Sequence, residues 1–423
     1  MIEETEKLKS TVESRAEHLA DRLVPYTLAG TGLVYLLTRN VTKALSVLMV
    51  DFSCALKLSM PISVLSAMRE AQSHGITVKG GKFLEAIAEA DTIVFDKTGT
   101  ITNGKLTVDT VMEIGAGLLG KALVVSDVIS FCDEEPDELL RIAACLEEHF
   151  PHSMAKAVVR AAMDKGLVHE ENHSKVEYIV AHGISSRIQD KKVIIGSYHF
   201  VFEDEQCVIP QGKEELFESL SGECSHLYLA IDGVLAAVIA ITDPIREEAP
   251  QVVSMLRKCG LSKIVMMTGD SERTAKVVAA KVGVDEYYSE VLPEDKASYV
   301  EKEHQAGRKV IMIGDGVNDS PALSAADVGI AICDGAEMAR EIADITIAGD
   351  NLEELVTLKR LSNALVKRIH GNYRQIVGFN TGLILCGIGG VMQPATSALL
   401  HNTSTLAISV KSMKDLLSEK DEK

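Results

Sequence analysis

The sequence predicts an α/β fold in which a parallel sheet is flanked by apolar helices near both ends of the chain. Short apolar runs at 92–95, 264–267 and 310–313 alternate with amphipathic helical stretches, as in strand–loop–helix repeats. Each run ends in a turn that contains both Asp and Gly. The longest weakly charged apolar stretches are confined to the two ends of the 423-residue chain.

Composition separates an acidic bulk from these apolar stretches. The chain has 61 Asp and Glu residues against 43 Lys and Arg residues, a formal net charge of −18. That balance excludes a nucleic-acid partner, because phosphate contacts need a basic surface. A hydrophobic content of 46% excludes a disordered chain. The length allows several domains, each able to bury a core.

Cysteine usage places the soluble part in a reducing compartment. The 8 cysteines form no C-x-x-C pair and no Cys/His set with zinc-finger spacing. We therefore expect free thiols and soluble domains in the cytosol. The first 20 residues are charged and helical in pattern, without the apolar core of a signal peptide.

The apolar stretches have the length of membrane helices, about 17–25 residues, or slightly less. They are 23–38, 44–68, 376–392 and 395–410. Basic residues flank the outer ends of the last pair, which predicts a hairpin with both ends in the cytosol: Lys367, Arg368, Arg374, Lys411 and Lys414. The first hairpin fits less well, because Arg39 and Lys43 lie in its turn. Buried core helices are the alternative.

Acidic loops follow all three predicted strands, at 96–100 (Asp-Lys-Thr-Gly-Thr), 268–270 (Thr-Gly-Asp) and 314–321 (Gly-Asp-Gly-Val-Asn-Asp-Ser-Pro). We expect them to converge, since ligands of parallel sheets bind at the carboxyl ends of strands. Asp96 can then attack phosphorus and form an acyl phosphate, while Asp315 holds Mg²⁺ with it. Thr268 and Lys296 can neutralise the transferring phosphoryl oxygens.

Thr98 occupies the position where a phosphatase would need an acid/base group, two residues after the nucleophile. A threonine hydroxyl cannot act as a general base near neutral pH. We therefore expect the aspartyl phosphate to persist until another group hydrolyses it, as a machine that couples ATP to motion requires.

The three loops resemble the phosphorylation domain of P-type ATPases, within the haloacid dehalogenase superfamily. The resemblance covers nearly the whole chain, and residues 1–20 match least clearly. It implies a Rossmann-like phosphorylation domain with an inserted α+β nucleotide-binding domain. Asp96 would be phosphorylated, and Asp315 and the Thr98 carbonyl would join it on Mg²⁺. The phosphate site would be shaped by Thr268, Gly269, Lys296, Asn318 and Asp319. Residues 243–246 (Asp-Pro-Ile-Arg) resemble the segment at which the family's chain re-enters this domain.

The insert resembles that of the metal-transporting branch, in which a Glu and a His-Pro pair precede a helix. Glu147 and His152 match, while Ser153 replaces the proline. Gly183 matches the second glycine of a G-x-G-V segment, whose first glycine is Ala181 here. The resemblance implies that these matching residues, with Asp270, bind ATP. A solvated surface position is the alternative for His152.

Residues 52–61 resemble the metal-site helix of that branch, which carries C-P-C or S-P-C and a later proline. Cys54 and Pro61 match, Ser53 replaces the central proline, and Lys57 replaces a small residue. Ionisable groups are costly inside a membrane, so Asp51 and Cys54 are candidates for binding the transported ion. A thiol suits soft or borderline ions, whereas Lys57 would repel a cation unless it is paired. Cys54 as a small core side chain is the alternative. Polar residues that could add ligands or join helices are Asn380, His401, Asn402 and Ser404.

The T-G-E segment of the family's actuator domain is absent. We therefore expect the C-terminal part of a pump, dependent on a separate chain that supplies the actuator domain and the upstream helices. The expected divisions are a stalk helix, a hairpin with the metal-site helix, two parts of the phosphorylation domain around the insert, and a second stalk and hairpin. They are 1–22, 23–74, 75–105, 106–224, 225–352 and 353–423.

The predicted function is ATP-driven transition-metal translocation through an aspartyl phosphate, with ATP and Mg²⁺ as cofactors, by an integral protein of the cell membrane. Two alternatives stay open. One is a haloacid-dehalogenase-type phosphohydrolase, against which Thr98 and the insert argue. The other is a non-transporting truncated membrane fragment.

Overall fold

The computed structural model gives two compact units, 1–90 with 344–423 and 91–343. The chain passes from the first unit to the second after Ala90 and returns at Asp344. The residues described are 11–102, 124–148, 153–167, 177–179, 183–188, 191–221, 224–314, 319–332, 341–348 and 351–417.

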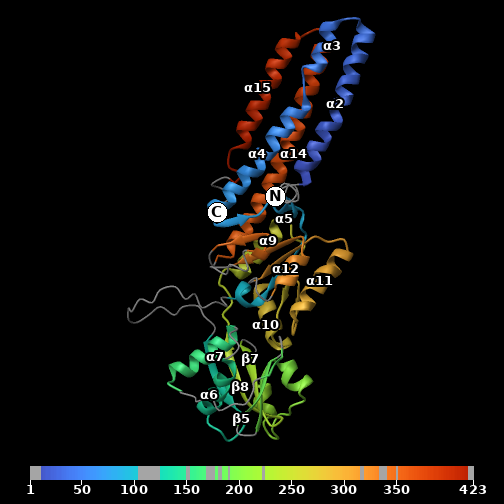
Figure 1. Ribbon diagram of the computed structural model, residues 1–423. Helices are drawn as coiled ribbons and strands as arrows, with labels where there is room; N and C mark the ends of the chain where they lie inside the picture. The colour runs from blue at the N-terminus through green and yellow to red at the C-terminus, as the bar shows by residue number, and fades with distance from the viewer. Residues whose placement is uncertain are drawn as a thin grey trace, which may run out of the picture. The chain divides into compact units, whose positions relative to one another are not determined.

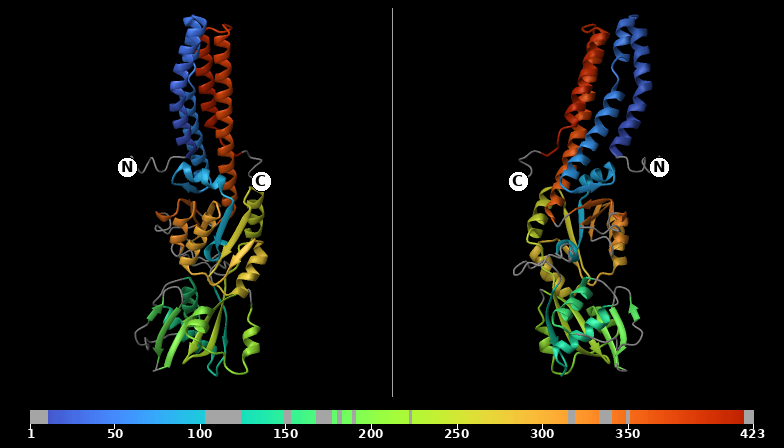
Figure 2. Two further views of the ribbon diagram at one scale, coloured as in Figure 1. Left: turned by 90° about the vertical axis from the view of Figure 1, so that its right-hand side faces the viewer. Right: turned by 60° about the vertical axis from the view of Figure 1, so that its left-hand side comes forward.

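The first unit is a bundle of long helices above a small base (Figure 1). The bundle helices are α2 (Thr11–Thr38), α3 (Val41–Leu48), α4 (Phe52–Ser73), α14 (Glu353–Ile388) and α15 (Pro394–Ser412). The views in Figure 2 agree that the N-terminal and C-terminal helices lie side by side. The base holds α5 (Gly81–Glu89) and two strands, β1 (Ile76–Val78) and β13 (Ile345–Ile347), which pair antiparallel.

The bundle exposes many large apolar residues on its outside, while its interior is a mixture of apolar and polar residues. Of the 25 large hydrophobic side chains exposed in the described residues, 21 lie on the bundle helices or their connections, among them Leu37 and Leu399. Its buried positions include many small polar side chains: Ser46, Ser59, Ser63, Asn372, Asn380, Ser397, His401, Ser409 and Ser412. Apolar residues such as Leu56, Met60 and Ile369 are buried as well. A helix bundle in water differs on its outer face, where polar residues are the rule.

Within the described part of the chain, no helix combines the length and the apolar character that crossing a membrane requires. The predicted spans 23–38, 376–392 and 395–410 fall on α2, α14 and α15. The predicted span 44–68 is interrupted between α3 and α4, where the Asp51 carboxylate accepts the N–H of Cys54 at 3.2 Å. The hairpins stay a prediction.

The first sheet of the second unit is parallel and has the strand order β12-β11-β2-β9-β10. Its strands are β2 (Thr92–Asp96), β9 (Lys263–Met267), β10 (Glu286–Tyr288), β11 (Val310–Gly314) and β12 (Val328–Ile332). Its helices are α9 (Ala249–Lys258), α10 (Glu272–Val282), α11 (Pro293–Gln305) and α12 (Ser320–Ala325). Every residue of β2, β11 and β12 is buried, as expected for strands of a parallel sheet covered on both faces. The parallel α/β fold is thereby confirmed.

The second sheet is antiparallel, with the order β3-β8-β7-β6-β5-β4. Its strands are β3 (Val124–Ser130), β4 (Glu177–Ile179), β5 (Gly183–Ile188), β6 (Lys191–Gly196), β7 (Ser225–Ile231) and β8 (Val234–Thr242). One face packs on α6 (Pro136–Glu147) and α7 (Ser153–Asp164). The other packs on η2 (His199–Asp204) and α8 (Glu214–Glu218).

The expected domain boundary after residue 224 falls inside this sheet, because β7 and β8 belong to it. A tight turn joins the two strands, with positive φ at Asp232 (49°) and Gly233 (80°). Asp-Gly suits such a turn, in which both central residues need positive φ. The hairpin therefore closes locally onto the antiparallel sheet before the chain returns to the parallel one.

Candidate functional site

Asp96 is the last residue of β2, the central strand of the parallel sheet. It lies opposite Met267 of β9, so Thr268 and Gly269 follow at the same edge. On the other side Phe95 lies opposite Ile313, which brings Gly314 and the loop after it to that edge. The predicted convergence of strand ends is therefore present for the described residues. Asp315 and Asn318 lie outside them.

Lys296, in the first turn of α11, joins two carboxylates at this edge. Its ammonium Nζ is 2.7 Å from Asp96 Oδ1 and 2.6 Å from Asp319 Oδ1. Burial lowers the pKa of Lys296, but Asp96 and Asp319 raise it above its ordinary value. The lysine therefore stays protonated in the working pH range. It provides fixed positive charge beside the proposed nucleophile.

Asp319 closes over Gly314 at the end of β11. Asp319 is 1% exposed, and a Cβ added to Gly314 would lie 2.3 Å from Asp319 Oδ2. Any side chain at 314 would displace this carboxylate and its lysine partner. Close packing against Asp319 therefore explains why residue 314 is a glycine.

A second buried ion network surrounds Lys97, directly after Asp96. Its Nζ lies 2.6 Å from Asp270 Oδ2 and 3.1 Å from Asp243 Oδ2, and donates to Ser225 Oγ at 3.2 Å. Burial lowers the pKa of Lys97, but Asp270 and Asp243 raise it above its usual range. Burial raises the pKa of Asp270, but Lys97 lowers it below its ordinary value. Asp270, expected to bind ATP, is held by Lys97.

The sequence reasoning assigned no role to Lys97 or Asp243 in this network. The available signal was a lysine placed directly after an apolar strand, where a solvated charge is unexpected. Asp243 also accepts the hydroxyl of Thr102 at 2.7 Å. This bond ties the end of the loop after Asp96 to the segment 243–246. In that segment, Arg246 donates to the Thr102 carbonyl at 3.3 Å.

The loop after β2 turns sharply within η1 (Lys97–Ile101). Gly99 has a φ of 76°, which glycine adopts at little cost. Thr98 has a ψ of 122° and is not helical. In the second loop, the buried Thr268 accepts the N–H of Asp270 at 3.1 Å through its hydroxyl. At Gly269 a Cβ would make only an ordinary contact, 4.0 Å from the Val291 carbonyl, so packing does not require glycine there.

Two of the residues expected to bind the nucleotide, Glu147 and Gly183, lie in the antiparallel lobe, which is the antiparallel sheet with the helices that pack on it. Glu147 is buried at the end of α6. It lines a pocket of about 210 Å³ with residues of α7, among them Lys156, Val159, Arg160 and Met163. His152 lies outside the described residues. Gly183 has a packing explanation, since a Cβ there would lie 2.3 Å from the Phe200 ring and 2.5 Å from the Ile195 carbonyl.

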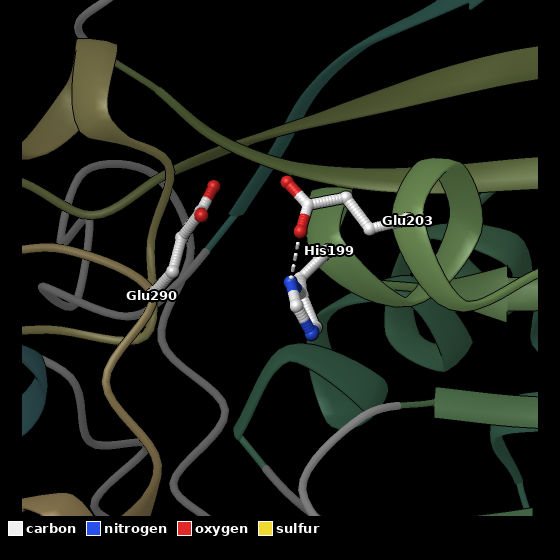
Figure 3. Close-up of side chains that lie close together, drawn as sticks. All are labelled: His199, Glu203 and Glu290. Carbon is white, nitrogen blue, oxygen red and sulfur yellow. Dashed lines mark ion pairs between the residues drawn. The ribbon is translucent and has the colours of Figure 1, made fainter. Parts of the chain in front are cut away.

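One group of possible metal ligands was not predicted, and Figure 3 shows it: His199, Glu203 and Glu290. Their ligand atoms lie within 4.8 Å of one another, and His199 Nδ1 is 2.8 Å from Glu203 Oε2. His199 and Glu203 are four residues apart on η2, an ordinary helical pair. Such exposed groups are common without a metal, and we assign none.

Asp51 and Cys54, the candidates for the transported ion, lie together at the start of α4. The Asp51 carboxylate caps the helix through the N–H of Cys54, which gives it a structural role. Cys54 is exposed. Deeper in the bundle, His401 Nδ1 lies 3.1 Å from Asn380 Oδ1, and both residues are buried.

A family model described as haloacid dehalogenase-like hydrolase matches residues 90–327. The chain therefore belongs to the haloacid dehalogenase-like hydrolases, the class that a parallel sheet with Asp96 at its central strand end defines. Within that class it is similar to heavy-metal P-type ATPases, so the resemblance predicted from the three loops is confirmed.

The zinc-exporting P-type ATPase of Mycobacterium marinum is 34% identical over 98% of this chain and 54% of its own length. The manganese-exporting P-type ATPase of Mycobacterium bovis is 33% identical over 98% of this chain and 55% of its own. A crystal structure of a zinc-transporting PIB-type ATPase in the E2.Pi state has a TM-score of 0.64 at 25% identity. The match covers 95% of this chain and 66% of the chain in that crystal structure. The chain thus spans about half the length of these curated relatives.

Proposed function

We propose that this chain transfers the γ-phosphoryl group of ATP to Asp96, and that this transfer drives a transition-metal cation across a membrane. The observation that carries the proposal is the Asp96–Lys296–Asp319 group at the central strand end. A carboxylate at such an edge, beside a permanent positive charge, suits attack on a phosphoryl group.

In the proposed step, an Asp96 carboxylate oxygen attacks the γ-phosphorus of ATP. A P–O bond forms to Asp96, the bond from phosphorus to the bridging oxygen breaks, and its electron pair leaves with ADP. Lys296 and Thr268 stabilise the negative charge on the transferring oxygens. Asp319 holds Lys296 in place at 2.6 Å.

The donor set at this edge fits Mg²⁺. The carboxylates of Asp96 and Asp319 both contact the single ammonium group of Lys296. The Asp96 carboxylate and the Thr98 carbonyl are hard oxygen donors, which Mg²⁺ prefers, and Asp315 would add a third. When bound, the ion neutralises charge on the phosphates.

For nucleotide binding we propose Glu147, His152 and Gly183, with Gly269, Asp270 and Asn318 near the phosphates. The support is the similarity to P-type ATPases and the pocket beside Glu147. Gly183 stays in this set although its packing against Phe200 explains it independently.

For the cation we propose Asp51 and Cys54, which lie together at the start of α4. His401 and Asn380 offer further polar groups inside the bundle. Zinc and manganese are named for the relatives, so the ion is proposed only as a transition metal.

We place the bundle in the cell membrane, with the second unit in the cytosol. The support is its apolar exterior, together with the relatives. The expected separate actuator chain is supported by none of the comparisons and is left out of the proposal.

The test is phosphorylation of the full chain by γ-labelled ATP with Mg²⁺. We expect an acid-stable, hydroxylamine-sensitive label that is absent in Asp96→Asn and present in the matched control Asp133→Asn, whose side chain is exposed. No label at saturating ATP would overturn the proposal. Rapid turnover of small phosphomonoesters without a lasting label would favour the phosphohydrolase instead.

A further inference from the structure

Lys359 of α14 is a buried cation that donates hydrogen bonds to three backbone carbonyls at the end of α5. Its Nζ donates to Ile87 at 2.6 Å, to Ala88 at 3.1 Å and to Ala90 at 2.9 Å. The residue is 2% exposed. An ammonium group has three N–H donors, and these carbonyls can use all of them.

Such a contact is closely fitted. A buried ammonium is costly unless its hydrogen bonds are satisfied. Here it also meets the C-terminus of α5, where unpaired carbonyls carry partial negative charge. Sliding α14 against α5 would leave both the charge and the carbonyls without these partners.

The contact lies where the chain passes between the two units. Ala90 is the last residue before the second unit, and β2, which ends at Asp96, begins two residues later. The chain returns at Asp344, where the N–H of Lys79 donates to the Asp344 carbonyl at 3.1 Å. Through β13 it then reaches α14. Lys359 therefore joins two segments of the first unit. One is the segment just before the chain enters the second unit, and the other is α14, which follows the return from it.

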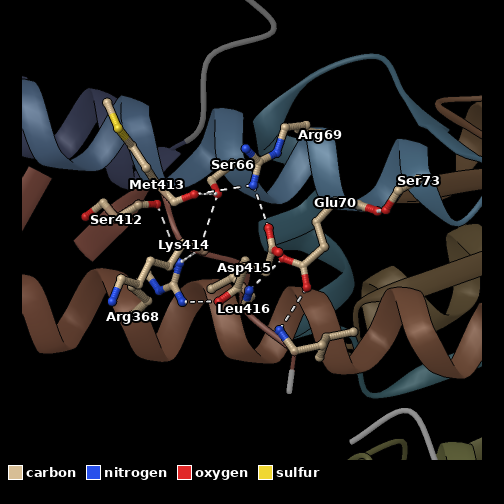
Figure 4. A network of polar contacts seen from close by, with 11 residues as sticks. Ser66, Arg69, Glu70, Ser73, Arg368, Ser412, Met413, Lys414, Asp415 and Leu416 are labelled. Atoms are coloured by element: carbon tan, nitrogen blue, oxygen red, sulfur yellow. Dashed lines mark hydrogen bonds and ion pairs between the residues drawn. The ribbon is translucent and has the colours of Figure 1, made fainter. Parts of the chain in front are cut away.

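Farther along α14, Arg368 holds the end of α15, as Figure 4 shows. Its guanidinium donates to the carbonyls of Lys414 and Asp415, the latter at 2.7 Å. Glu70 of α4 accepts the N–H groups of Leu416 at 2.6 Å and Leu417 at 2.9 Å. At this level α14 and α4 both bond the segment 414–417 that follows α15, and at another level α14 bonds the end of α5.

We propose that Lys359 is a positioning residue that couples the bundle to Asp96. A change at the phosphorylated strand shifts residues 87–90, and Lys359 passes that shift to α14. Coupling of this kind needs a continuous set of packed or bonded groups between two sites. The proposal rests on the proposed function of Asp96.

The experiment is hydrogen exchange on the full chain in detergent, with and without Mg²⁺ and beryllium fluoride, which mimics a phosphoryl group on a carboxylate. We compare the native chain with Lys359→Met and with the control Lys367→Met, an exposed lysine of the same helix. In the native chain and in the control, beryllium fluoride should change the rate of hydrogen exchange in α14 about five- to tenfold, which is in the range of ordinary coupling between sites. Lys359→Met should show the change only around Asp96.

A purely structural Lys359 would lower the melting temperature of Lys359→Met and leave its α14 response intact, which would overturn the proposal. If that variant does not fold, Lys359→Gln keeps two N–H donors, and its α14 response should fall below half. A full response in Lys359→Gln would likewise refute the coupling. If beryllium fluoride changes nothing around Asp96 in the native chain, the proposed function fails, and the coupling fails with it.

Discussion

Two buried lysines hold four carboxylates beside the strand that ends at Asp96. Lys296 binds Asp96 and Asp319, while Lys97 binds Asp243 and Asp270. Since Lys97 follows Asp96 directly, its ion pairs fix the start of the loop, while Lys296 contacts Asp96, the proposed nucleophile, from α11. Each buried charge has an opposite charge, as its desolvation requires.

Thr98 sets the expected lifetime of the phosphoenzyme. Thr98→Asp would place a general acid/base group two residues after Asp96 and should speed loss of the label about 10²- to 10⁴-fold. The measurement is decay of the label after a chase with unlabelled ATP. The control Thr98→Asn has a similar shape without the base and should decay like the native chain. Equal decay in the Asp variant would show that Thr98 does not govern persistence.

The Lys97–Asp270 pair should make stability depend on pH. The pKa of Asp270 is lowered by folding, so its contribution is present above the unfolded pKa of about 3.9 and is lost as pH falls through the folded value. Asp270→Asn should destabilise the chain at pH 7 by up to about 3 kcal/mol, with Asp243 still beside Lys97. Urea unfolding from pH 7 to pH 3 should show this difference shrinking below about pH 4. A difference that stays constant with pH would contradict this assignment.

At the scale of elements, the antiparallel lobe depends on one close contact between β5 and η2. Gly183 lies against the Phe200 ring and the Ile195 carbonyl, where a Cβ has no room. This contact explains the glycine at 183 by packing alone, without a nucleotide. The packing role and a nucleotide-binding role can be measured separately.

Gly183→Ala should destabilise the chain by about 1–3 kcal/mol, the usual cost of overpacking. ATP affinity of the folded fraction should also fall, because Gly183 belongs to the proposed nucleotide-binding set. Thermal unfolding and nucleotide titration together measure the two effects. The control Gly371→Ala adds its methyl in open space and should not destabilise. An unchanged ATP affinity of the folded fraction would leave Gly183 with the packing role alone and remove it from the proposed nucleotide-binding set.

The parallel sheet and its strand-end loops could be predicted because each loop adjoins its strand in sequence. Asp96 and Lys296 were both expected, and they meet. The position of Lys97 directly after an apolar strand was a signal of a buried charge. Its partners Asp243 and Asp270 could not be predicted, because they lie in distant segments where their charges look like ordinary loop charges. The boundary after 224 was misplaced because β7 and β8 are apolar runs, and such runs do not reveal which sheet they join.

At the scale of the whole molecule, the outer face of the bundle differs from the surface of a soluble protein. Its outer face carries most of the exposed large hydrophobic side chains, and its interior holds serines, asparagines and a histidine. Composition alone could indicate apolar helices, but which face is apolar depends on how the helices pack.

Leu399→Glu tests what covers that outer face. Leu399 is 67% exposed on α15, so in water the change should be nearly neutral. Against lipid, a buried carboxylate costs about 2.5–3.5 kcal/mol, and the membrane fraction resistant to alkaline carbonate should fall severalfold. The control Leu399→Phe should stay in that fraction. Recovery of the native chain in the carbonate supernatant would contradict the membrane placement.

The position of β2 also has a consequence for synthesis of the chain. Its neighbours in the sheet, β9 and β11, begin at residues 263 and 310, so both are made long after Asp96. At about 5–20 residues per second, the strand waits on the order of 10–40 s for its second neighbour. Until β9 is made it is an apolar segment with two open edges, and until β11 is made one edge stays open. Such a segment can pair wrongly with other chains. The antiparallel lobe is complete by Thr242 and can fold meanwhile. Nascent chains arrested before residue 310 should therefore need a chaperone at β2, whereas the lobe that follows it should not.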